Sequence, residues 1–227
     1  MNILAIDTST DWCGIALVQN GECRYKIEEQ IPRKHAEKLP RFYELLKDQT
    51  NLDEINLNAL AVSIGPGSFT GLRVGLGFTK GLAFAKELPI IPVPTLQIIA
   101  ANSGLIIDKF TVMMYSHRDI IYYQRFTFSN NQYKPINEEK VGSWNSIEHT
   151  ESAVHSGCEK LVVNQTYPSV HPSAEMAGLL AEKNFNEWVL ENPYALEPNY
   201  ISPFELAKPY KLLLTLYVLS LKIFILS

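Results

Sequence analysis

The chain contains few of the residues that build disulfide frameworks. Its 227 residues include three cysteines, Cys13, Cys23 and Cys158, which cannot all pair within one chain. A two-residue hairpin turn at Asn20-Gly21 would place Val18 opposite Cys23 and leave Cys13 far along the ladder, which disfavours a bridge between those two cysteines. The sequence therefore predicts reduced thiols and a cytoplasmic location.

Histidines are equally few, and their spacing is unfavourable for metal binding. No two of them are three or four residues apart, as ligands on one helix face would be, and no H-E-x-x-H motif occurs. A P-loop and a G-x-S-x-G nucleophile elbow are also missing. We therefore expect no metal site and no catalytic residue in this chain, whose five histidines are His35, His117, His149, His155 and His171.

An excess of positive charge is also missing. The chain has 20 Lys and Arg residues against 24 Asp and Glu residues, which gives a net charge of −4. A protein that binds nucleic acid by itself needs a basic surface to displace the counterions of the phosphates. Any contact with RNA is therefore expected to depend on a partner.

Long apolar runs are scarce, with one exception. The apolar run at the N-terminus ends at Asp7 and has no positive segment before it, so it predicts a strand rather than a signal peptide. The last 17 residues, KLLLTLYVLSLKIFILS, are almost entirely apolar but contain Lys222 and fall short of the roughly 20 residues of a membrane span. They fit a packed helix or strand, an altered reading frame, or a segment at a membrane surface; no membrane association is expected.

Hydrophobic periodicity and turn signals predict an α/β fold in two related units. The first has strands at 2–6, 13–19 and 22–28 in an antiparallel meander. A helix through Leu39, Phe42 and Leu46 follows, then a strand at 59–64, a helix capped by Ser68, a strand at 88–93 and a helix capped by Thr95. The pattern restarts near residue 104, with strands at 110–115, 120–128 and 161–163 and helices at 146–154 and 173–183. We expect domains at 1–104 and 105–205, followed by the atypical tail 206–227.

The turn Asp7-Thr8-Ser9-Thr10 is a candidate nucleotide site. An aspartate at a strand end can hold a metal-bound water, and the hydroxyl and amide groups of a tight turn can face a phosphate. Proteins that bind ATP in this way usually have glycine where Ser9 stands. The alternative is a polar turn held by local hydrogen bonds, with no ligand.

The segment GPGSFTGLRVGLGFTKGLA, residues 65–83, predicts a helix with small residues aligned along it. Gly71, Gly75 and Thr79 are spaced by four, as are Gly77 and Gly81. Each helical glycine costs about 1 kcal/mol relative to alanine, so close approach by another element must offset that cost. The residues alone leave open whether that element is the chain's own sheet or a helix of another subunit.

These segments resemble, in order, the TsaB (YeaZ-type) family, bacterial subunits of the machinery for tRNA threonylcarbamoyladenosine. The resemblance rests on MNILAIDTSTDWCGIALVQNG, on residues 35–40, on the glycine-rich segment 65–83 and on residues 91–96. It is strong over residues 1–105 and returns at 172–174 and 197–201. It implies a two-lobed fold of the actin, sugar-kinase and Hsp70 (ASKHA) type.

The resemblance also implies a non-catalytic subunit that binds and activates a TsaD-type threonylcarbamoyltransferase, with a TsaE-type ATPase in the same machinery. ATP and a metal ion would then be bound by the partners and tRNA only by the complex, and a homodimer is possible. Asp7, Thr8 and Ser9 would be a vestigial nucleotide site. The family's interface helices correspond to the partner-contact candidates His35, Leu39, Phe42, Leu46, Gly71, Leu72, Val74, Gly75, Phe78, Thr79 and Leu82.

Two departures from the family pattern keep alternatives open. The second lobe has Ser116-His117-Arg118 where relatives usually have Asp-Ala-Arg, and the chain continues into the apolar tail where relatives commonly end. A metal-dependent glycoprotease-like peptidase is one alternative, although the missing histidine pairs disfavour it. An ASKHA-type ATP phosphotransferase is another, disfavoured by Ser9 and by the lack of a second phosphate motif.

Overall fold

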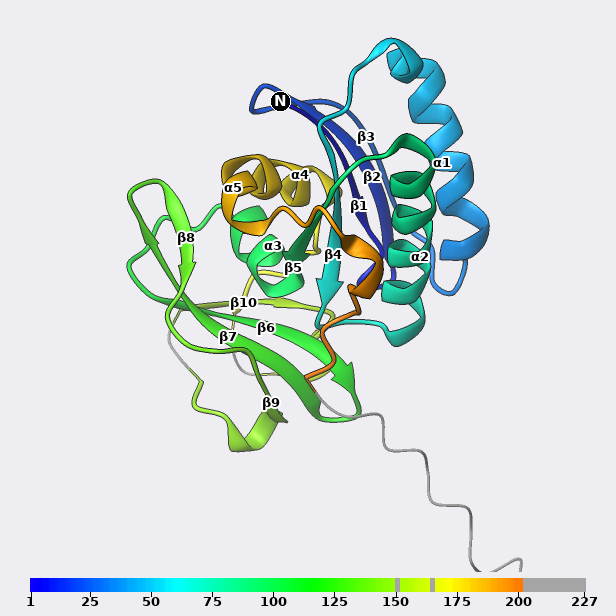
Figure 1. The fold of residues 1–227 in the computed structure, drawn as a ribbon. Helices are drawn as coiled ribbons and strands as arrows, with labels where there is room; N and C mark the ends of the chain where they lie inside the picture. Colours follow the sequence, from blue (N-terminus) through cyan, green and yellow to red (C-terminus); the bar gives the residue numbers. More distant parts are fainter. Residues whose placement is uncertain (150–151, 164–165, 202–227) are drawn as a thin grey trace, which may run out of the picture.

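The computed structural model describes residues 1–149, 152–163 and 166–201. Within them the chain forms two five-stranded mixed sheets with helices packed against them (Figure 1). This arrangement confirms the predicted fold class, α/β with two lobes that each contain a mixed sheet. The tail predicted at 206–227 lies outside the described residues. No described helix has both the length and the apolar character that a membrane crossing requires.

The first sheet has the strand order β3-β2-β1-β4-β5. Strands β1 (Asn2–Asp7), β2 (Trp12–Gln19) and β3 (Glu22–Gln30) form the predicted antiparallel meander, and β4 (Ala59–Gly65) and β5 (Ile90–Pro94) run parallel to β1. Asn20 and Gly21 both have positive φ, 52° and 80°, as a tight hairpin turn requires. Val18 pairs with Cys23, which confirms the predicted register.

Helices cover both faces of this sheet (Figure 1). The helices α1 (His35–Thr50) and α2 (Phe69–Lys86) pack on one face, where Leu39, Leu46 and Leu76 join the apolar side chains of the strands. The helices α3 (Thr95–Asn102) and α4 (Ala174–Lys183) pack on the other. A short 3₁₀ turn, η1 (Leu52–Glu54), follows α1.

The two predicted helix caps have different outcomes. Ser68 caps α2, since its hydroxyl accepts a hydrogen bond from the Gly71 amide at 3.2 Å. The prediction for Thr95 is wrong, because Pro94 is the N-cap of α3 and Thr95 is its first residue. The Thr95 hydroxyl is buried and has no hydrogen-bond partner among the described residues.

The second sheet has the order β10-β6-β7-β8, with β9 also paired to β7. Its strands are β6 (Phe110–His117), β7 (Ile120–Ser129), β8 (Gln132–Pro135), β9 (Lys140–Ser143) and β10 (Ala153–Ser156). The helix predicted at 146–154 is wrong, because that region contains the end of a 3₁₀ turn, η2 (Trp144–Ser146), and the start of β10. The strand predicted at 161–163 is also wrong, because the amides of Leu161 and Val162 turn back to the Cys158 carbonyl.

Helix α4 crosses back from the second half of the chain onto the first sheet. It packs across β1 and β2 so closely that a Cβ atom on Gly178 would lie 2.6 Å from Val18 Cγ2 and 3.2 Å from Ala5 Cβ. Its last turn is fixed by Glu182, which lies 3.0 Å from the Met1 amine. The chain then forms α5 (Phe185–Trp188) and the 3₁₀ turn η3 (Pro193–Ala195). The division of the chain into two domains at residue 104 stays a prediction. Helix α4 belongs by sequence to the second of these domains but packs on the sheet of the first.

We predict opposite effects for two helical Gly→Ala substitutions. Gly178→Ala should lower the free energy of unfolding by about 1–3 kcal/mol, because its methyl group would overpack against buried Val18. Gly81→Ala should raise it by up to about 1 kcal/mol, because that position is exposed and a Cβ there meets no atom within 4 Å. Urea unfolding of both variants measures the difference. A stabilised Gly178→Ala variant would contradict the packing described for α4.

Candidate functional site

The turn after β1, predicted as a nucleotide site, is closed off inside the molecule. Asp7, Thr8 and Ser9 have at most 1% of their surface exposed. Asp7 accepts hydrogen bonds from the Ser9 amide at 3.2 Å and from the Ser9 hydroxyl. Burial raises the pKa of Asp7 to about 6, while hydrogen bonds from Ser63 and Ser9 oppose that shift. The turn therefore bonds to itself, as the alternative interpretation of the sequence proposed.

Helix α2 and the loop before it occupy the space in front of this turn. A Cβ atom on Gly67 would collide with the Ser9 carbonyl, and one on Gly71 or Gly75 would collide with Thr8. The Thr8 hydroxyl donates to the Gly71 carbonyl at 2.8 Å, which fixes the helix against the end of β1. No side chain fits at these glycines, so the backbone of α2 and of the loop before it packs directly on the turn.

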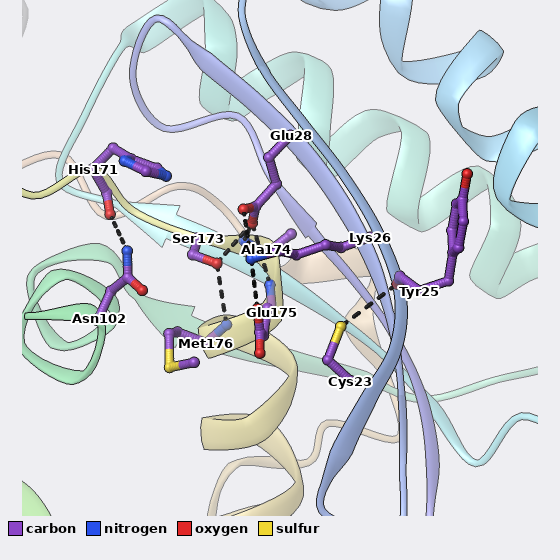
Figure 2. Close-up of polar contacts among 10 residues, drawn as sticks. All are labelled: Cys23, Tyr25, Lys26, Glu28, Asn102, His171, Ser173, Ala174, Glu175 and Met176. Carbon is purple, nitrogen blue, oxygen red and sulfur yellow. Dashed lines mark hydrogen bonds and ion pairs between the residues drawn. The ribbon is translucent and has the colours of Figure 1, made fainter. Parts of the chain in front are cut away.

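A polar cluster joins β3 to the beginning of α4 at the same end of the first sheet (Figure 2). Glu28 Oε1 accepts hydrogen bonds from the Ser173 hydroxyl and the Ala174 amide, both at 2.7 Å. Lys26 Nζ lies 3.3 Å from the Glu28 carboxylate and 2.6 Å from that of Glu175. A helix N-terminus favours negative charge, so Glu28 supplies from within the chain what a bound anion would supply. The sequence alone gave no sign of this contact.

The partner-contact candidates separate into a buried set and an exposed set. Eight of the eleven are buried within the chain itself, and Gly71 and Gly75 lie against Thr8, so as partner contacts these eight stay a prediction that would act through packing rather than through exposed side chains. The eight are His35, Leu39, Phe42, Leu46, Gly71, Leu72, Gly75 and Thr79. Val74, Phe78 and Leu82 are partly exposed on the outer side of α2. A partner surface on these helices stays a prediction, and the exposed residues on the outer side of α2 are where a partner can reach it.

An apolar surface lies on this outer side, between α1 and α2. A shallow pocket there is lined by Pro40, Arg41, Tyr43, Glu44, Phe78 and Leu82. The Tyr43 and Phe78 rings meet edge to face with centroids 5.8 Å apart. Gly77 and Gly81 are exposed on α2, and a Cβ atom at either would meet nothing within 4 Å. We call Pro40, Tyr43, Gly77, Phe78, Gly81 and Leu82 the outer surface.

Sequence reasoning found only part of this surface. It aligned Gly77 with Gly81 but did not name them as contacts, because spacing alone does not say which row of glycines faces out. It missed Pro40 and Tyr43, and it missed the neighbouring Phe84, which is 72% exposed. Phe84 lies away from the positions of α2 that face the core. An apolar aromatic residue at such a position is the signal that would have identified the outer side of the helix.

The described residues offer little that suits metal or thiol chemistry. They contain no group of three or more His, Cys, Asp or Glu side chains that could hold a metal ion. Burial raises the pKa of the Cys13 and Cys158 thiols to about 12, which keeps both protonated. Cys23 is partly exposed, and burial raises the pKa of its thiol as well.

Comparison with known proteins shows a consistent set of relatives. A family model described as "TsaD: tRNA N6-adenosine threonylcarbamoyltransferase" matches residues 27–184, more than half of the chain. The chain is 46% identical over 105 residues to the tRNA threonylcarbamoyladenosine biosynthesis protein TsaB of Escherichia coli K12, which covers 45% of this chain and 44% of that protein. The chain thus matches less than half the length of that relative.

Two further matches extend over more of the chain. The TsaB protein of Bacillus subtilis 168 is 29% identical over 148 residues, covering 63% of this chain and 64% of that protein. The solved structure of YeaZ from Pseudomonas aeruginosa superposes with a TM-score of 0.74 at 26% identity, covering 88% of this chain and 99% of that chain. With the family model, these matches show that the chain belongs to the TsaB/YeaZ family.

Proposed function

We propose that this protein is a non-catalytic subunit in the formation of tRNA threonylcarbamoyladenosine, and that it binds and activates a TsaD-type threonylcarbamoyltransferase. Support for the pathway comes from the relatives, which are named as biosynthesis proteins of this modified nucleoside. Support for the partner comes from the family model, which is described by the transferase itself. Two chains of one fold can pair through equivalent faces, as symmetric dimers do.

The observation that carries the proposal is the outer surface between α1 and α2. Gly77 and Gly81 stand one helical turn apart and expose the backbone of α2, so a partner helix can approach closely there. Tyr43, Phe78 and Leu82 flank the two glycines with partly buried apolar side chains. Aromatic side chains in such a setting supply much of the binding energy of protein interfaces. The same face would serve a homodimer, which then competes with the transferase.

The closed turn after β1 supports a role without catalysis. Asp7, Thr8 and Ser9 are buried under α2, which disfavours the alternative of an ATP phosphotransferase. We infer that ATP and a metal ion act on the partner subunits, including a TsaE-type ATPase. The net charge of −4 supports contact with tRNA through the complex rather than through this chain alone.

Substitutions on the outer surface should remove partner binding and leave the fold intact. Gly77→Arg places a long charged side chain where a helix would pack, so we expect affinity for the TsaD-type partner to fall at least about 100-fold. Isothermal titration or co-purification measures the loss, and unfolding by urea checks the fold. Asn186→Arg, at an exposed position of α5, is the matched control and should bind normally. Normal binding by Gly77→Arg would show that the interface lies elsewhere.

A reconstituted reaction tests the activating role. The purified chain should modify no tRNA by itself. When it is added to the TsaD-type transferase, the TsaE-type ATPase and the TsaC-type synthase of the same pathway, with ATP, threonine and bicarbonate, it should restore threonylcarbamoyladenosine, measured by mass spectrometry of digested tRNA. Equal modification with and without the chain would rule out activation. Modification by the chain alone would rule out a non-catalytic role.

Nucleotide titration distinguishes two possibilities for the turn after β1: a turn that stays buried under α2, and an open nucleotide site that is blocked only by Ser9. If Ser9 in place of glycine were the obstacle, Ser9→Gly would restore ATP binding. Because α2 fills the space in front of the turn, we expect no heat of binding from Mg·ATP with either the natural chain or Ser9→Gly. Millimolar binding by Ser9→Gly alone would show that the turn opens in solution. The same titration with Zn²⁺ tests the peptidase alternative.

A further inference from the structure

The segment after η3, residues 196–201, runs along α2 from the first sheet to the second (Figure 1). We call it the strap. Just before it, the Tyr194 carbonyl accepts a hydrogen bond from Lys80 Nζ at 2.9 Å, and Leu196 packs on the core beneath α1 and α2. The start of the strap is thus fixed to the first lobe by the Tyr194 carbonyl before it and by the Leu196 side chain.

Asn199 makes contacts with both lobes from the middle of the strap. Its backbone amide donates to the Ile64 carbonyl at 2.7 Å, at the end of β4. Its side-chain amide donates to Glu139 Oε2 at 2.6 Å, next to the start of β9 in the second sheet. Gly65 lies against the Asn199 carbonyl, since a Cβ atom on Gly65 would be 2.7 Å from that oxygen. One residue therefore joins the end of β4 in the first sheet to the start of β9 in the second.

Tyr200 fixes the strap to the beginning of α2. Its hydroxyl accepts a hydrogen bond from Arg73 Nε at 2.9 Å, and its ring lies 5.2 Å from that of Phe69. The Arg73 guanidinium stacks over the Phe69 ring at 3.8 Å. Leu196 and Tyr200, on either side of Asn199, are thus held to the first lobe, and the Asn199 side chain reaches Glu139 in the second.

We propose that the strap is a clasp between the two lobes, in which Asn199 makes the closure and the carboxyl group of Glu139 lets protons tighten or loosen it. The contact differs from the outer surface, and the proposal does not depend on the function proposed above. In its closed form the clasp sets the position of the second sheet relative to β4 and α2.

The protonation state of Glu139 determines how strongly the clasp closes. Burial raises the pKa of Glu139 to about 7, and the hydrogen bond from Asn199 opposes the shift. The charged groups nearest along the chain, Glu138 and Lys140, are exposed, and the Arg73 side chain is bonded to the Tyr200 hydroxyl. The closed clasp binds a proton more tightly than the open one, in which Glu139 has its ordinary pKa of 4.5. Closure is therefore strongest at low pH and weakens as pH rises from about 4.5 to about 7.

Hydrogen exchange of the full chain tests the clasp. We expect protection of the strap, corrected for the intrinsic pH dependence of exchange, to fall about 70-fold between pH 5 and pH 8, as the shift of the Glu139 pKa from 4.5 to about 7 requires. Glu139→Gln keeps an acceptor for Asn199 but cannot ionise, so its protection should not change with pH. Asn199→Asp places a second carboxyl group beside Glu139 and should steepen the loss. Glu138→Gln, on the exposed neighbour, is the control and should behave as the natural chain does.

A second measurement on the natural chain needs no variant. The ¹³C chemical shift of the Glu139 carboxyl carbon should titrate with an apparent pKa near 7. Titration near the ordinary 4.5 would overturn the proposal, as would a Glu139→Gln variant whose strap keeps the full pH dependence. Protection that does not depend on pH in the natural chain would overturn it as well.

Discussion

The close approach of α2 to the end of β1 is the constraint on which the rest of the molecule depends. Thr8 and Ser9 touch the backbone at Gly71 and Gly75 of α2 and at Gly67 in the loop before it, where even a methyl group would collide. This contact buries the turn that the sequence predicts as a nucleotide site. It also fixes the rotation of α2 about its axis, and that rotation decides which side chains of the helix meet solvent.

The glycines of α2 form two rows, an inner row of Gly71 and Gly75 that packs on Thr8 and an outer row of Gly77 and Gly81 that is exposed. We explain the two rows by different packing partners. Each helical glycine costs about 1 kcal/mol relative to alanine. For the inner row the cost is offset within the chain, because Gly71 and Gly75 allow the hydrogen bond from Thr8 and the burial of Leu76 against the sheet. For Gly77 and Gly81 nothing in the described chain offsets it, since a Cβ atom there would meet open space. The stability lost at the outer row therefore argues for a second molecule.

Local signals in the sequence were reliable where the structure is decided locally. The turn at Asn20-Gly21 and the cap at Ser68 follow from the conformations and hydrogen bonds of a few neighbouring residues. Strand β10 was missed because its four residues are held by parallel pairing with β6, about 40 positions earlier. The spacing of the glycines revealed two rows, but their directions depend on where α2 meets β1. That contact is between residues about 60 positions apart and leaves no local trace.

Polar residues at the ends of the strands bond to one another rather than to a ligand. Asp7 is satisfied by Ser9 and Ser63, and Glu28 by the amides at the start of α4. Asn199 similarly joins Ile64 to Glu139. In a fold that binds nucleotides between its lobes, such groups would be left to contact phosphate and metal. Here Asp7 is bonded within the first lobe, whereas Asn199 joins the two lobes. A partner-binding role on the outer surface of α2, as proposed above, would not require any of these groups to bind a ligand.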